Sequence, residues 1–156
     1  MRIRLLYTVV VPVLSAVVLM AVAAPSECST NESPRTQALR HQNAGFELAR
    51  HDRLSEAIAE YEAGIALDPN VGSLYYMRGL AYLDLQDFQA ALADLDRALE
   101  LEPDPPQYYY QRAVVSHALG NRDQALADLE TLLSITSDPD YVYPALSLQD
   151  RIRGGD

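Results

Sequence analysis

Two arginines in the chain are each followed by an aspartate at the same distance, and such pairs could form charge-assisted hydrogen bonds. Arg78 precedes Asp94, and Arg112 precedes Asp128, by sixteen residues in both cases. A guanidinium can meet both oxygens of a carboxylate at once, which suits a partly buried link between two elements. We expect structural ion pairs here. Two alternatives stay open: an ion pair from Glu60 to Arg78, and arginines presented to an anionic ligand.

The other titratable residues do not form a catalytic or metal-binding pattern. The three histidines, His41, His51 and His117, lack the i, i+4 spacing of metal ligands on a helix. The chain has no glycine-rich phosphate loop, no Gly-x-Ser-x-Gly motif and no nucleophile beside a base. We therefore expect a protein that is not an enzyme, with no catalytic residues, no metal ligands and no cofactor.

Composition narrows the classes further. The chain has 156 residues, 22 acidic and 12 basic, all the basic ones arginine, and its formal charge is −10. This balance argues against nucleic-acid binding, which requires a basic face. Hydrophobic residues make up 49%, too many for a wholly disordered chain. One cysteine cannot form a disulfide framework within the chain.

The amino-terminal segment, residues 1–23, has the pattern of an export signal. Two arginines precede an almost wholly apolar run over residues 5–24, and residues 21–23 have the small-x-small pattern that signal peptidases need. The run is also long enough to span a bilayer as an uncleaved anchor. Either alternative places the folded part outside the cytoplasm. Residues 24–35 are mostly small and polar and are expected to form a flexible linker.

Beyond this linker the chain repeats itself every 34 residues. Gly45, Gly79 and Ala113 fall on one column of this repeat, and other small residues recur in the same way. Self-similarity at a fixed period is the signature of stacked repeats. The repeat positions expected to hold the structure together are Gly45, Ala57, Pro69, Gly79, Ala91, Ala98, Pro103 and Ala125.

Each unit contains two helical patterns separated by a short polar break. Small residues allow the two helix backbones to approach, and larger neighbours interlock around them. Proline closes a unit because it cannot continue a helix. Within a repeat domain of residues 36–153, the three units span about 38–71, 72–105 and 106–139. The expected helices span about 36–50, 54–67, 72–85, 88–101, 106–119 and 122–135, followed by a capping helix at about 140–153.

These residues resemble a known family. The stretch from Tyr75 through Gly79, Ala91 and Ala98 to Pro103 is similar to the tetratricopeptide repeat. The resemblance implies an all-α fold, a right-handed α-solenoid of three helix-turn-helix repeats whose first helices line a concave groove. It also implies a domain that binds peptides or partner proteins, because members of this family are not usually enzymes.

The first helices carry a second set of regularly spaced side chains, which we call the groove stripe. Their spacing places them on one side of each helix. The tyrosines among them combine an apolar ring with a hydroxyl, which suits a binding surface. In the alternative, some of these rings fill the interior of the solenoid. The stripe comprises Leu39, Gln42, Phe46, Ala49, Ser73, Tyr76, Leu80, Leu83, Gln107, Tyr110, Val114 and His117. We expect partner contacts from eight of them: Gln42, Phe46, Tyr76, Leu80, Leu83, Tyr110, Val114 and His117.

The expected partner is an apolar or aromatic protein segment. Relatives that bind the acidic tails of heat-shock chaperones use lysine and asparagine on these groove columns. Here Gln42 and Phe46 occupy the corresponding places of the first unit, and the chain has no lysine. That clamp is absent.

The sequence therefore predicts a non-catalytic scaffold that is exported, to the periplasm or the exterior, and binds a peptide or partner protein. The first alternative is a structural subunit of a cell-envelope assembly, anchored in the membrane by residues 5–24, that uses the solenoid for assembly or self-association. A second is an accessory domain that affects a neighbouring enzyme in trans.

A repeat stack needs its exposed end covered by a helix that is half polar. In the capping helix after the third unit, we expect Tyr143, Leu146 and Ile152 to face the stack and Gln149 to face water. Pro144 is acceptable only in the first turn of this helix.

Overall fold

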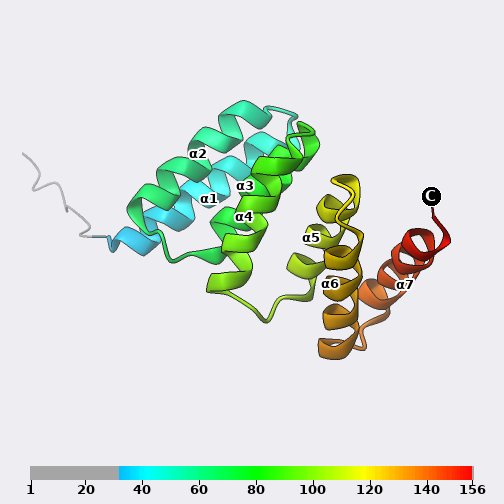
Figure 1. Cartoon of the computed structure of the whole chain (residues 1–156). Helices are drawn as coiled ribbons and strands as arrows, with labels where there is room; N and C mark the ends of the chain where they lie inside the picture. The colour runs from blue at the N-terminus through cyan, green and yellow to red at the C-terminus, as the bar shows by residue number, and fades with distance from the viewer. Residues whose placement is uncertain (1–31, 156) are drawn as a thin grey trace, which may run out of the picture. The chain divides into compact units, whose positions relative to one another are not determined.

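The computed structural model describes residues 32–155, and the export signal, the possible anchor and most of the predicted linker lie outside this range. Within it the chain forms seven α-helices and no strand (Figure 1). The helices are α1 (Pro34–Arg50), α2 (Leu54–Leu67), α3 (Gly72–Asp84), α4 (Phe88–Leu101), α5 (Pro106–Ala118), α6 (Arg122–Ile135) and α7 (Pro139–Gly154).

None of these helices is long and apolar enough to cross a membrane.

The helices begin and end close to the predicted positions, and side-chain caps are present at the starts of α1, α4 and α7. At α1 the difference is two residues. Ser33 accepts a hydrogen bond through its Oγ from the backbone N–H of Thr36 (3.1 Å), and Pro34 occupies the first turn, where its missing N–H costs nothing. The expected linker is therefore too long at its end: α1 begins at Pro34, not after residue 35.

The short break within each repeat needs one residue in the left-handed backbone region. Asp52, Gln86 and Gly120 occupy this column, with φ angles of 60°, 61° and 78°. Only glycine adopts this conformation without a steric cost from Cβ. The third repeat therefore has the least strained turn of the three.

The helices form two layers. In each unit the first helix packs along the second, and each hairpin packs on the next (Figure 1). The first helices also contact one another, α1 with α3 and α3 with α5, whereas α2, α4 and α6 do not contact each other. Because the first helices are closer together, they form the inner layer of the solenoid.

Small residues allow this packing. A Cβ atom on Gly79 would lie 3.4 Å from the backbone oxygen of Ala91 and 3.3 Å from Cγ of Leu95, so the two helices approach closely at this point. At Gly45 the space is smaller still, because Tyr61 Cε1 lies 2.5 Å from the place of a Cβ. The alanine columns are fully buried, at Ala57, Ala91, Ala98 and Ala125.

One carboxylate connects the second and third units. Glu102, in the turn after α4, accepts a hydrogen bond from the backbone N–H of Gly72 through Oε1 (3.0 Å) and one from the Tyr108 hydroxyl through Oε2 (3.0 Å). A negative charge at the start of α3 also complements the dipole of that helix. Burial of the Tyr108 ring raises the pKa of its hydroxyl, and the hydrogen bond to Glu102 raises this pKa further.

The orientation of α7 differs from the expectation. Its buried side chains are Ala145, Leu148, Gln149 and Ile152, whereas Tyr143 is 72% exposed and Leu146 41% exposed. The expectation is confirmed for Ile152 and is wrong for Tyr143, Leu146 and Gln149.

The repeat columns explain this correction. Tyr143 and Leu146 correspond to Tyr75 and Arg78, and Arg78 faces α4, the second helix of its own unit. In the described residues α7 has no such second helix, so the same columns face solvent. The expectation for Pro144 is also wrong, since Pro144 lies inside α7 beyond its first turn.

We predict that the narrow space at Gly45 depends on Tyr61. Gly45→Ala places a methyl group against this ring and should lower the free energy of unfolding by about 2 kcal/mol. In a Tyr61→Leu background, which copies the leucine of the other two repeats, the same change should cost less than about 0.5 kcal/mol. Urea unfolding measures both costs, and equal costs in the two backgrounds would contradict the prediction. Gly79→Ala is the control, with an intermediate loss.

We also predict opposite effects for two substitutions in the left-handed turn column. Gly120→Ala should destabilise the protein by about 1 kcal/mol through its φ angle alone, because no atom lies within 4 Å of the added methyl group. Gln86→Gly should stabilise it by a similar amount. Thermal unfolding of both variants measures the two changes in stability. A Gly120→Ala variant that is more stable than the original chain would contradict the prediction.

Candidate binding site on the inner helices

Both expected arginine–aspartate pairs are present, each within one repeat. Arg78 donates from Nε and Nη2 to the two carboxylate oxygens of Asp94, at 2.8 Å each. Arg112 donates in the same way to Asp128, at 2.9 and 2.6 Å. Glu60 is not the partner of Arg78, because it lies 2.7 Å from Nδ1 of His41.

Each arginine also faces a second acid from the preceding repeat. Nη1 of Arg112 donates to Oδ1 of Asp96 at 2.8 Å, and Nη1 of Arg78 lies 3.9 Å from Oε1 of Glu62. Sequence reasoning missed these acids, although both stand sixteen residues before their arginine. Each guanidinium therefore links its own helix to the second helices of two successive units.

These contacts occupy the arginines. Both guanidinium side chains are 18% exposed, and the hydrogen bond to the aspartate raises the pKa of Arg112 and of Arg78. Asp128 is buried and also accepts a hydrogen bond from Nε2 of Gln124 (3.1 Å). A guanidinium held on both sides by carboxylates is a poor receptor for another anion, so the arrangement favours a structural role.

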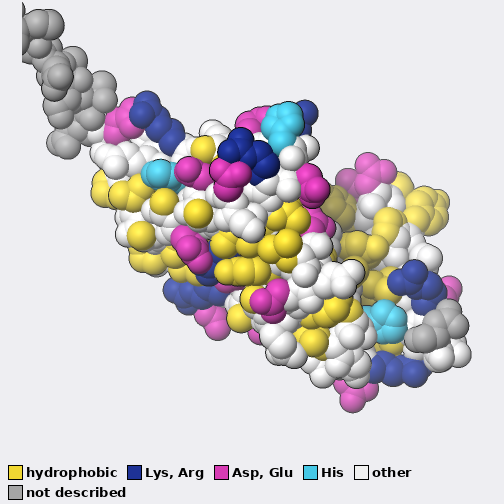
Figure 2. All heavy atoms as spheres, turned by 90° about the horizontal axis from the view of Figure 1, so that it is seen from above, with side chains coloured by type: hydrophobic (Ala, Val, Ile, Leu, Met, Phe, Trp, Pro, Cys, Tyr) yellow, Lys and Arg dark blue, Asp and Glu magenta, His cyan; other side chains and the backbone are white. Residues whose placement is uncertain are grey.

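The groove stripe contains an apolar cavity of about 270 Å³ between α1 and α3. Phe46, Ala49 and Leu80 of the stripe line it, and Phe46 is 45% exposed. The other lining residues are Arg50 of α1, Tyr61 of α2, and Met77, Ala81 and Asp84 of α3. Figure 2 shows hydrophobic side chains at the surface in several groups, separated by acidic and basic ones.

Most cavity residues outside the stripe were missed by sequence reasoning. Arg50, Met77 and Asp84 stand next to stripe residues on α1 and α3, where these two helices face each other. Contact between successive first helices was the signal that could have found them. Arg50 also lies over the Phe46 ring, 5.9 Å from its centroid, at the rim of the cavity.

Other stripe residues belong partly to the interior. Tyr76 stacks on the buried Tyr108, with 4.3 Å between ring centroids, and burial raises the pKa of Tyr76. Tyr110 and Val114 pack against the hydrophobic cluster shared by α5, α6 and α7. The alternative of interior tyrosines therefore applies to this half of the stripe.

The remaining stripe residues have polar or mixed surroundings. Gln42 accepts a hydrogen bond through Oε1 from the hydroxyl of Ser73 (2.8 Å), which joins α1 to α3. Leu83 packs against the cluster between α4 and α5, and His117 is half-buried near the end of α5. Phe46, Ala49 and Leu80 lie on adjoining first helices, so the structure brings these three stripe residues together around the cavity.

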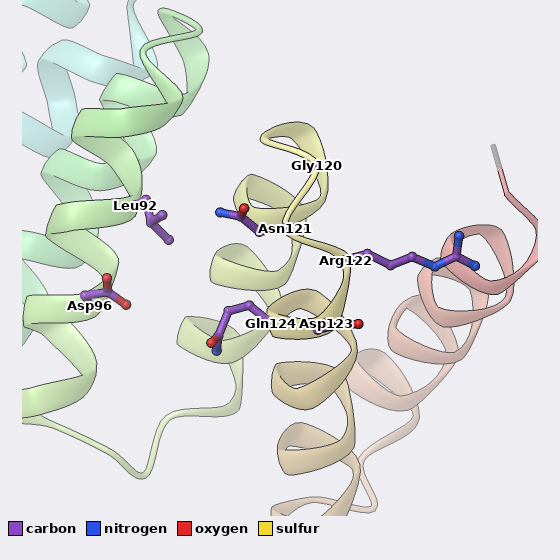
Figure 3. A pocket seen from close by; sticks show the side chains of 7 residues that line it. All are labelled: Leu92, Asp96, Gly120, Asn121, Arg122, Asp123 and Gln124. Carbon is purple, nitrogen blue, oxygen red and sulfur yellow. The ribbon is translucent and has the colours of Figure 1, made fainter.

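A second, more polar cleft of about 660 Å³ lies between the outer helices α4 and α6. Figure 3 shows Asn121 and Gln124 directed toward Leu92 and Asp96 of α4, whereas Arg122 points away toward α7. Asp96 already binds Arg112, and Gln124 binds Asp128. Two of the polar side chains of this cleft are thus used within the protein. Residues 32–155 contain no cluster of His, Cys, Asp and Glu placed to hold a metal ion.

We predict that Arg112 stabilises the fold mainly by neutralising a buried acid. Arg112→Leu leaves Asp128 uncompensated at 2% exposure and should cost about 3 kcal/mol of unfolding free energy. Adding Asp128→Ala removes the buried charge and should recover most of this loss. A double-mutant cycle by urea unfolding tests the coupling, and costs that simply add would contradict it.

Comparison with known proteins agrees with this geometry. Residues 73–105 and 106–139 each match the sequence profile of the tetratricopeptide repeat. No curated protein sequence matches the chain. Several solved structures do: the first TPR of Spaghetti (RPAP3), bound to the HSP90 peptide SRMEEVD, is 25% identical, with a TM-score of 0.73 over 77% of this chain and 93% of that one.

Two further structures extend the comparison. The second TPR domain of human RPAP3, in complex with the HSP70 peptide SGPTIEEVD, is 26% identical over 77% of this chain and 98% of that one, with a TM-score of 0.71. The Yersinia enterocolitica type III secretion chaperone SycD, in complex with a peptide of the translocator YopD, is 13% identical over 73% and 90%, with a TM-score of 0.69, and shows the fold alone. The chain therefore contains tetratricopeptide repeats, and its described part has the fold of a tetratricopeptide-repeat solenoid.

Proposed function

We propose that this chain is a non-catalytic scaffold that binds an apolar or aromatic segment of a partner protein along its inner helices. The proposal rests on the fold, since structures at 25% and 26% identity hold peptides. The single observation that carries it is the uncharged groove stripe with its cavity at Phe46 and Leu80.

The absence of charge on the stripe supports an apolar ligand. None of its twelve residues is Asp, Glu or Arg, although the chain has 22 acidic and 12 basic residues. At about 270 Å³ the cavity is smaller than typical small-molecule sites of roughly 300–1,000 Å³. One large side chain of a protein segment suits this volume better than a free ligand does.

The peptides held by the similar structures are acidic, and that chemistry does not suit this chain. SRMEEVD and SGPTIEEVD end in carboxylates, which require cations in the groove. This chain has no lysine, and Arg78 and Arg112 are bound to aspartates. Only Arg50 stands at the rim of the cavity, together with Asp84.

We also propose that the scaffold acts outside the cytoplasm. The support is the amino-terminal sequence: two arginines, the apolar run of residues 5–24 and the small residues at 21–23. In the alternative, the same run stays uncleaved and anchors the solenoid in the membrane. The mass of the mature amino terminus separates the two, because cleavage gives a chain that starts at Ala24.

Selection from a random peptide display library against the full chain tests the ligand class. We expect enrichment of segments with Phe, Leu or other large apolar residues, and we expect the peptide SRMEEVD to bind at least tenfold more weakly than the best selected peptide. Phe46→Glu should weaken the selected peptide at least tenfold, since it introduces a charge beside the cavity. Ile135→Glu, at a residue of similar exposure on α6, is the matched control. Enrichment of acidic carboxyl-terminal sequences, or unchanged binding to Phe46→Glu, would contradict the proposal.

A further inference from the structure

The last helix has one uncovered face. Its buried residues Ala145, Leu148, Gln149 and Ile152 follow the i, i+3, i+4, i+7 spacing of one helix side. The set Tyr143, Leu146, Ser147 and Asp150 has the same spacing, two residues earlier, which places it on the opposite side. All four residues of this set, the α7 outer face, are exposed.

The repeat itself shows what this face is built to contact. Leu146 and Ser147 correspond to Arg78 and Gly79 of α3, and these two residues face α4, through the bonds to Asp94 and through the close approach at Gly79. The α7 outer face thus matches the surface that a first helix turns toward its own second helix. In the described part of the chain that second helix is missing.

The side chains of this face indicate the chemistry of the helix that would cover it. Where α3 and α5 have an arginine that needs an acid, α7 has Leu146. A second helix like α4 or α6 has an aspartate at the facing position. Packed on α7, it would bury this carboxylate against Leu146 without a partner. Ser147, in the column of small residues, permits close approach. The occupant must therefore be apolar at the centre.

We propose that the occupant is α7 of a second copy of this chain, packed antiparallel about a two-fold axis between Leu146 and Ser147. Tyr143 stands three residues before Leu146 and Asp150 three residues after Ser147, so the two-fold axis brings the Tyr143 hydroxyl of each copy beside the Asp150 carboxylate of the other. Among the side-chain hydrogen bonds and ion pairs within residues 32–155, none involves either side chain. The face is therefore self-complementary in its apolar centre and in its polar ends.

This contact closes as a dimer and does not propagate into a filament, because a two-fold axis uses the same face on both copies. One face of a 16-residue helix buries less than the roughly 1,200 Å² at which stable interfaces begin. The dimer is consequently a weak one, populated at protein concentrations of about 100 μM. The contact leaves the groove stripe free, so it is independent of the proposed ligand binding.

Sedimentation equilibrium of the full chain between about 5 and 500 μM tests the proposal. The expected result is a monomer–dimer equilibrium whose dissociation constant increases at least tenfold in Leu146→Glu, with an unchanged circular dichroism spectrum. Leu85→Glu, at an exposed leucine at the end of α3, is the matched control and should stay within twofold of the original chain. Phe46→Glu should likewise leave the dimer unchanged, which separates this contact from the groove.

A cross-linking experiment tests the antiparallel arrangement and does not depend on the stability of Leu146→Glu. In a Cys28→Ser background, Ser147→Cys lies beside the two-fold axis and should form an intermolecular disulfide under mild oxidation. Ser134→Cys, exposed near the end of α6, should not. A chain that is monomeric at 500 μM, a dimer that Leu146→Glu does not weaken, or equal cross-linking of the two cysteine variants would each overturn the proposal.

Discussion

The close approach of two helices at small side chains is the constraint on which the rest of the structure depends. At Gly79 a Cβ atom would already touch Leu95 and the backbone of Ala91, and at Gly45 it would overlap the ring of Tyr61. Closely packed helix backbones leave no room between them for water or large side chains. Each helical hairpin is therefore a rigid unit that can pack on the next one. The contact of α1 with α3, and of α3 with α5, then follows from stacking these hairpins.

Stacking also leaves the groove stripe without Asp, Glu or Arg of its own, although Arg50 and Asp84 line its cavity. The arginines in the repeat bind acids on the second helices, as Arg112 does with Asp96 and Asp128. Burial of an ion pair in this way stabilises little beyond what an apolar contact would, but it penalises any arrangement that leaves the acid alone. A packing register that separates a buried aspartate from its arginine therefore has a higher free energy. The inner helices carry no such pairs along the groove stripe, and this is why an uncharged surface with an apolar cavity can persist on an acidic protein.

The periodic part of the structure could be predicted from the sequence, and the departures from the period could not. The six repeat helices and the Arg78 and Arg112 pairs follow from positions that recur every 34 residues. The orientation of α7 could not be predicted in this way. A position in the repeat indicates the side of the helix on which a side chain lies, but not whether a neighbouring helix covers that side. The cavity was found only in part, since Met77 and Asp84 line it through contacts between repeats.

The candidate site lies beside a position where the repeats differ, and this has a physical reason. In the first unit Tyr61 replaces the leucine of the other two, and its ring fills the space beside Gly45 and extends to Met77, whose Sδ accepts from the Tyr61 hydroxyl at 3.9 Å. The ring thus forms the floor of a cavity at the junction of the first two units, with Phe46 left exposed at its edge. Identical repeats would pack identically and leave no distinctive site, so a repeat protein gains a specific binding surface by departing from its own consensus at one junction.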